Sequence, residues 1–126
     1  MTATDPETVV RNFLKAWETR DLDAIMAFFD DDAVYENVPV PPVTGLDEIR
    51  NFIGGILYAF KNINVVIHHQ VSDGVIVMNE RTDTITAENG TKVQLRCMGY
   101  FEIRDGKVVT WHDYFDGTAL KKVFDP

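Results

Sequence analysis

Cysteine is almost absent from this chain, whose 126 residues include only Cys97. A single cysteine excludes an intramolecular disulfide and is typical of a reducing compartment, so we expect a cytoplasmic protein. The strand-like surroundings of Cys97 indicate a buried small side chain rather than a nucleophile. Residues 1–7 lack the basic and apolar regions of a secretory signal, and no apolar run approaches the length of a membrane span. We therefore expect neither export nor a membrane partner.

Basic residues are also few, with 12 Lys and Arg against 20 Asp and Glu, which gives a net charge of −8. This balance argues against nucleic acid as a partner, because its phosphates require clustered positive charge. His68, His69 and His112 do not have the spacing of metal ligands, so no metal site is expected. There is no glycine-rich phosphate loop, and no G-x-S-x-G elbow of a serine hydrolase.

The chain does have the length and the 45% hydrophobic content of one globular domain, spanning residues 1–126. Helical spacing of apolar residues predicts a helix over about 6–19, a short helix capped by Asp21, and a third helix capped by Asp47. The acidic run 30–32 is expected to end the second helix. Residues 34–38 indicate a short strand, and the proline-rich segment 39–45 a rigid loop.

The second half of the chain alternates between apolar and polar residues, which predicts strands at about 63–71, 75–87, 92–104 and 107–116. Asn89-Gly90 and Asp105-Gly106 separate the last three runs, and these pairs are strong hairpin signals. Helices followed by an antiparallel meander define the α+β class, and a curved sheet around helices would leave a pocket between them.

Two charged side chains share one face of the strand expected over 75–87, because residues two apart point the same way. They are Arg81 and Asp83, and Asp113 shares an apolar face of the last strand with Trp111 and Phe115. Burying such charges is costly unless they are paired. Convergence of the three side chains would form either an acid–base site in an apolar pocket or an ion network that only holds the sheet together.

An acid–base site of this kind has a definite chemistry. Arginine can hold two carboxylates, and two carboxylates that share a desolvated site can divide into an acid and a base. Tyr35 and Asn37 supply a hydroxyl and an amide that, with the basic carboxylate, could hold one water molecule. Water held in this way, opposite a proton donor, suits addition of water across a strained or polarised bond.

Four segments in this order and spacing resemble the limonene-1,2-epoxide hydrolase family, over most of the chain. The segments are VYEN at 34–37, PVPPVTG at 39–45, ERTD at 80–83 and WHDYFD at 111–116. The resemblance implies a curved six-stranded mixed sheet, shaped as a cone around a pocket, with three to four helices on its concave side. This is the fold of the nuclear-transport-factor-like (polyketide-cyclase-like) superfamily. The resemblance also implies a homodimer that works without metal or cofactor.

The same resemblance implies specific catalytic residues. Asp113 would be the general base on a water molecule also held by Tyr35 and Asn37. Asp83 would protonate the epoxide oxygen, and Arg81 would orient both carboxylates. Small apolar epoxides, such as cyclic terpene or cycloalkene oxides, would open to vicinal diols in one step. The expected pocket residues are Ile56, Phe60, Ile85, Leu95 and Phe115.

One departure from the family pattern is His112, which stands where an arginine often precedes the base. By alternation this side chain points away from the site. Two other functions remain open on the same fold. One is a ketosteroid-isomerase-like or polyketide-cyclase-like enzyme, whose site also uses an Asp base and an acidic donor. The other is a non-catalytic protein that binds a small molecule.

Overall fold

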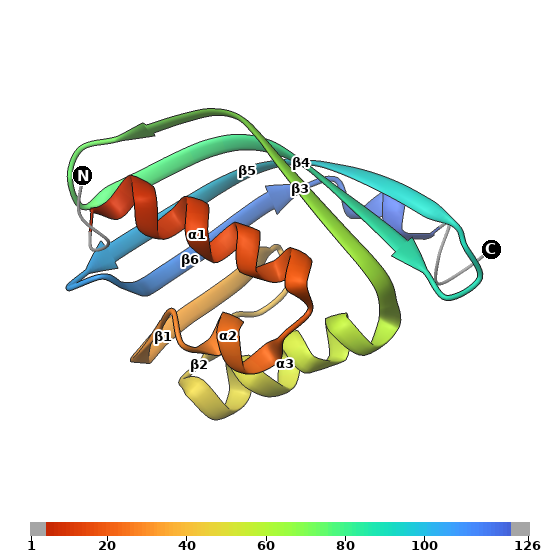
Figure 1. Cartoon of the computed structure of the whole chain (residues 1–126), viewed down its shortest axis with the longest axis horizontal. Helices are drawn as coiled ribbons and strands as arrows, with labels where there is room; N and C mark the ends of the chain where they lie inside the picture. The colour runs from red at the N-terminus through yellow and green to blue at the C-terminus, as the bar shows by residue number, and fades with distance from the viewer. Residues whose placement is uncertain (1–4, 122–126) are drawn as a thin grey trace.

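Six strands form one curved, open sheet, and helices cover its concave side (Figure 1). The computed structural model describes residues 5–121. Within this range the helices are α1 (Pro6–Thr19), α2 (Leu22–Met26) and α3 (Leu46–Ala59), followed near the end by a short 3-10 helix, η1 (Gly117–Leu120). The strands are β1 (Phe29–Val38), β2 (Val43–Thr44), β3 (Phe60–Ser72), β4 (Ile76–Ala87), β5 (Lys92–Arg104) and β6 (Lys107–Phe115). The α+β class and the six-stranded mixed sheet are thus confirmed.

The order of the strands brings the two halves of the chain together. They lie in the order β2-β1-β6-β5-β4-β3, so that the early strand β1 is beside the last strand, β6. This pair is parallel, and the other pairs are antiparallel. In its register Tyr35 is opposite Trp111 and Asn37 is opposite Asp113.

Two of the predicted turns have the backbone that their sequences favour. Asp105 and Gly106 have φ angles of 51° and 75°, and Gly90 has a φ of 90°. Asp, Asn and Gly tolerate this left-handed region, which the tight hairpin turns require. The meander β3-β4-β5-β6 follows from these turns.

Helix starts are partly as predicted. The Asp5 carboxylate accepts from the Thr8 N–H at the start of α1, and the Asp21 carboxylate accepts from Ala24 at the start of α2. The prediction that Asp47 caps α3 is wrong, because the helix begins one residue earlier and Gly45, with φ of 84°, precedes it. Asp47 lies in the first turn, where its charge still favours the helix dipole.

Two other expectations for the first half were wrong. The acidic run 30–32 does not end a helix but belongs to β1, and the segment 39–45 contains the short strand β2. Burial of Phe29 and Ala33 anchors the start of β1, and Phe29 and Val34 pair with β6 on either side of the acidic run, which lies in the bulge between them.

An aromatic cluster fills the space between α1 and the sheet. Phe13 of α1 makes edge-to-face contacts with Phe29 and Trp111, and Trp111 stacks on Phe101. Such rings bury large apolar areas and prefer these geometries. At the end of α1, Arg20 donates to the Leu57 and Phe60 carbonyl oxygens, which joins α1 to the corner between α3 and β3.

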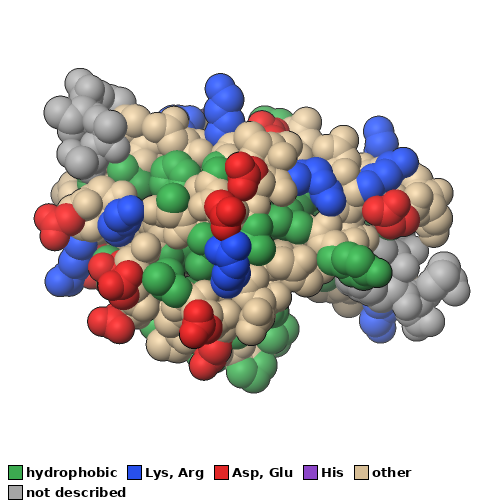
Figure 2. All heavy atoms as spheres, turned by 60° about the horizontal axis from the view of Figure 1, so that its bottom comes forward, with side chains coloured by type: hydrophobic (Ala, Val, Ile, Leu, Met, Phe, Trp, Pro, Cys, Tyr) green, Lys and Arg blue, Asp and Glu red, His purple; other side chains and the backbone are tan. Residues whose placement is uncertain are grey.

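On the face shown in Figure 2, acidic and basic side chains are interspersed, with hydrophobic side chains between them. None of the helices within residues 5–121 is long and apolar enough to cross a membrane.

Candidate active site

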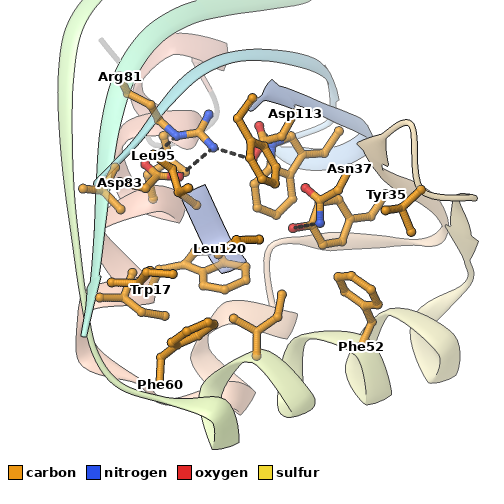
Figure 3. Close-up of a pocket in the computed structure, with 18 residues that line it drawn as sticks. Trp17, Tyr35, Asn37, Phe52, Phe60, Arg81, Asp83, Leu95, Asp113 and Leu120 are labelled. Carbon is orange, nitrogen blue, oxygen red and sulfur yellow. Dashed lines mark hydrogen bonds and ion pairs between the residues drawn. The ribbon is translucent and has the colours of Figure 1, made fainter. Parts of the chain in front are cut away.

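A cavity of about 250 Å³ lies between the concave face of the sheet and helices α1 and α3. All the side chains predicted for the site line it: Tyr35, Asn37, Arg81, Asp83 and Asp113, and the apolar Ile56, Phe60, Ile85, Leu95 and Phe115. Figure 3 shows the carboxylates and Arg81 at one end of the cavity and Phe52 and Phe60 at the other. The cavity thus combines an apolar chamber with convergent polar groups, as ligand sites do.

Arg81 lies between the two carboxylates. Its Nε donates to Asp83 Oδ1 over 2.9 Å and its Nη2 to Asp83 Oδ2 over 3.1 Å. The same Nη2 also donates to Asp113 Oδ2. Arg81 is only 1% exposed, so these charge-assisted bonds form where water does not compete.

Asp113 is held on its other side by Trp111, two residues earlier on the same face of β6. The Trp111 Nε1–H donates to Asp113 Oδ1 over 2.7 Å. The Trp111 ring stacks on Tyr35 with a centroid separation of 4.1 Å and an angle of 6°. Sequence reasoning missed this donor and treated Trp111 as core, although strand alternation had already placed it beside Asp113.

Burial dominates the electrostatics of Asp113. It raises the pKa of this carboxyl, the Arg81 charge and hydrogen bond lower it, and the Asp83 charge raises it, so that the pKa lies above its usual range. Burial lowers the pKa of Arg81, but the Asp113 and Asp83 charges more than offset this effect, and the guanidinium stays charged. One arginine between two carboxylates favours retention of one proton by the pair, because the site is then neutral.

Tyr35 and Asn37 form the wall next to Asp113. The Asn37 Nδ2 donates to the Tyr35 hydroxyl oxygen over 3.1 Å. Burial, with the Asp113 charge adding to it, raises the pKa of Tyr35, so the phenol stays protonated and keeps a hydrogen to donate. An amide, a phenol and a carboxylate thus converge within one corner of the cavity.

The surroundings of the other polar side chains near the site do not favour a catalytic role. Cys97 Sγ lies 3.5 Å from Asp83 Oδ2, and burial raises the pKa of the thiol, so it stays protonated and is a poor nucleophile. His112 lies on the outer face of the sheet, with Nε2 3.7 Å from Glu36 Oε1, as alternation predicted. Within residues 5–121 no cluster of three or more His, Cys, Asp or Glu side chains could hold a metal ion.

A family model described as a SnoaL-like domain matches residues 10–111. The chain belongs to this family. The SnoaL-like chain is also 34% identical to the epoxide hydrolase EphG of Mycobacterium tuberculosis, over 92% of its own length and 82% of that protein. It is therefore homologous to an epoxide hydrolase.

Solved structures agree with this relationship. A limonene-epoxide-hydrolase-like (LEH-like) epoxide hydrolase of M. tuberculosis superimposes with a TM-score of 0.79 and 33% identity, over 90% of this chain and 84% of that one. A nuclear-transport-factor-2-like protein of unknown function from Burkholderia pseudomallei has a TM-score of 0.86 over the full length of both chains. At 20% identity this second likeness shows the fold alone.

Proposed function

We propose that this protein is an epoxide hydrolase that adds water to small apolar epoxides, such as cyclic terpene or cycloalkene oxides, and yields vicinal diols. The observation that carries the proposal is the pair of carboxylates, buried Asp113 and partly buried Asp83, joined through Arg81 at the polar end of an apolar cavity. Homology to an epoxide hydrolase supports the reaction class. A cavity of about 250 Å³ supports small substrates, because pockets for drug-sized ligands have volumes of roughly 300–1,000 Å³.

In this mechanism Asp113 is the general base. Water lies between the Asp113 carboxylate, the Asn37 amide and the Tyr35 hydroxyl, and loses a proton to Asp113 as its oxygen attacks an epoxide carbon. The carbon–oxygen bond of the strained ring breaks in the same step. The raised pKa of Asp113 makes its ionised form a stronger base than an ordinary aspartate.

Asp83 is the acid of the same step. It donates the proton that the carboxylate pair retains to the epoxide oxygen, which becomes the second hydroxyl group of the diol. Arg81 stabilises the charge that moves between the carboxylates, and it contacts both. Afterwards Asp113 holds the proton and Asp83 does not, so one proton transfer restores the starting state. No covalent enzyme intermediate forms and no cofactor takes part.

A single-turnover reaction in oxygen-18 water tests the proposal. Excess protein is incubated with limonene-1,2-epoxide or cyclohexene oxide, and diol and protein are then analysed by mass spectrometry. Labelled diol with no label in the protein supports direct attack by water. Label in the protein would contradict it, and no diol from a wider panel of epoxides would favour an isomerase-like enzyme or a binding protein.

We also propose that the cytoplasmic protein is a homodimer, formed through the outer face of the sheet. There the β5 side chains Arg96, Met98, Tyr100 and Glu102 follow one another at alternate positions, positive at one end, negative at the other and apolar between. Met98 is 50% exposed, and Tyr114, opposite it on β6, and Met78, opposite Tyr100 on β4, are also exposed. A two-fold axis through the middle of this row would place Arg96 opposite Glu102 of a second copy.

A further inference from the structure

A row of side chains crosses the sheet beside the Arg81 guanidinium. Gln70 on β3 is opposite Asn79 on β4, Asn79 is opposite Gly99 on β5, and Gly99 is opposite Asp113 on β6. Register partners on neighbouring strands present their side chains on one face. Gly99 is therefore the position in this row that has no side chain.

The missing side chain leaves the space that Arg81 occupies. A Cβ atom added at Gly99 would lie less than 3.0 Å from Arg81 Nη1, and 2.9 Å from both Asn79 Oδ1 and Phe101 Cε1. Arg81 itself belongs to the adjacent row, opposite Cys97, and its guanidinium reaches Asp113 across β5. The φ angle of Gly99 is not positive, so space rather than backbone conformation accounts for this glycine.

A chain of hydrogen bonds holds the guanidinium from the other side. Arg81 Nη1 donates to Asn79 Oδ1 over 3.3 Å, Asn79 Nδ2 to Gln70 Oε1 over 3.1 Å, and Gln70 Nε2 to the Glu7 carbonyl oxygen over 3.2 Å. Asn79 is 1% exposed. The chain uses Nη1, the guanidinium nitrogen that neither carboxylate takes, and ends at the backbone of α1.

We propose that Gly99, Asn79 and Gln70 are positioning residues, which together fix the Arg81 guanidinium so that its Nε and Nη2 face the two carboxylates. Gly99 leaves the space that the guanidinium occupies. The hydrogen bond from Arg81 Nη1 to Asn79, which is itself bonded to Gln70, balances the attraction of the guanidinium to the two carboxylates. This inference rests on the proposed function for its effect on rate, but not for its effect on the carboxylates.

The test compares Gly99→Ala with wild type. The added methyl group displaces Arg81, and a misplacement of about 1 Å can cost on the order of 100-fold in rate. We expect kcat for epoxide opening to fall on the order of 100-fold with little change in KM, because the residues of the apolar chamber are untouched. Gly55→Ala is the matched control, since Gly55 is exposed on α3 with no atom near an added Cβ, and we expect it to leave kcat unchanged.

A titration of the Asp113 carboxyl carbon by ¹³C NMR tests positioning without turnover. The groups that face this carboxyl are Arg81 and Asp83 from β4, Tyr35 from β1 and Cys97 from β5. Because the Arg81 charge lowers the pKa of Asp113, displacement of Arg81 raises it in Gly99→Ala. A change that only loosened the fold would lower the melting temperature without moving this titration.

Gln70→Leu provides the second variant, at a half-buried position where folding is less at risk. It leaves Asn79 without its acceptor, so we expect a smaller upward shift of the same titration. If Gly99→Ala fails to fold, Gln70→Leu decides the question by this measurement. Unchanged titration in the folded variants would overturn the inference. Absence of epoxide turnover by wild type would instead contradict the proposed function, and the titration would still decide positioning.

Discussion

Asp113 on β6 lies directly beside Asn37, its register partner on the parallel strand β1. Both side chains enter the cavity from the same face, and the Tyr35 hydroxyl, which accepts from Asn37 Nδ2, comes from the next position on that face of β1. The proposed water site is therefore built across a contact between strands from opposite ends of the chain. Its geometry depends on the β1–β6 pairing as much as on the three residues.

Replacement of either carboxylate tests whether the pair serves catalysis or the stability of the fold. We expect Asp113→Asn and Asp83→Asn each to lower diol formation by on the order of 10²–10⁴-fold, the usual contribution of general acid or base catalysis. Measurement of kcat/KM with cyclohexene oxide, together with melting temperature, checks this. Asp105→Asn is the control, because Asp105 is exposed and Asn tolerates its positive φ.

A structural role for the ion network makes the opposite prediction. A binding protein would lose several kcal/mol of stability on Asp83→Asn, because a buried charge then loses its partner. Lost turnover at an unchanged melting temperature would speak against that alternative, while wild-type turnover in either variant would refute the mechanism.

The rate should depend on pH through Asp113. Burial raises the pKa of this carboxyl, and the base must be ionised, so kcat/KM should fall as pH decreases through a pKa above the ordinary value of about 3.9. On the alkaline side, loss of the proton that the pair retains removes the acid and the rate falls again. A pH–rate profile of buffered diol formation checks both limbs. A profile flat down to about pH 4 would contradict this account.

Arg81→Met should destabilise the fold in a pH-dependent way. Removal of the guanidinium leaves the buried Asp113 carboxylate facing the partly buried Asp83 carboxylate, and breaking a buried pair costs about 3–5 kcal/mol. Without Arg81, burial and the Asp83 charge raise the pKa of Asp113 further above its unfolded value. The folded state then binds more protons, so the free energy of unfolding should recover as pH falls.

Urea unfolding of Arg81→Met and wild type at several pH values measures this recovery. Arg50→Met is the control, because the Arg50–Asp23 pair is exposed and contributes little. A loss of stability that is constant between pH 5 and 8 would mean that the carboxylates do not interact as proposed.

The outer face of the sheet can be tested by charge reversal. We expect wild type to sediment as a dimer, and Arg96→Glu to weaken self-association, because the introduced carboxylate would then face the carboxylate of Glu102 of the second copy. The double variant Arg96→Glu/Glu102→Arg should restore the dimer by restoring the opposite charges. Analytical ultracentrifugation over a range of concentrations measures all three. A monomeric wild-type protein would contradict the proposed homodimer.

The elements that were predicted well depend on local chemistry. α1 begins at Pro6 after the Asp5 cap, and the hairpins follow Asn89-Gly90 and Asp105-Gly106, because caps and tight turns involve only neighbouring residues. The predictions were wrong where contacts with distant segments of the chain determined the local structure. The run 30–32 looks like a helix end by itself but lies in β1, at a bulge between Phe29 and Val34, which pair with β6 on either side of it.

Strand alternation alone placed Arg81 with Asp83 and Trp111 with Asp113, because a period of two depends only on the extended backbone. The residues themselves indicated Tyr35 and Asn37 as holders of a water molecule with the basic carboxylate, and the resemblance then identified that carboxylate as Asp113. Two features needed tertiary structure: the parallel pairing that sets Asn37 beside Asp113, and the space at Gly99 through which Arg81 reaches it. No local pattern encodes either feature, since each arises from segments that come together only when the sheet forms and packs on the core.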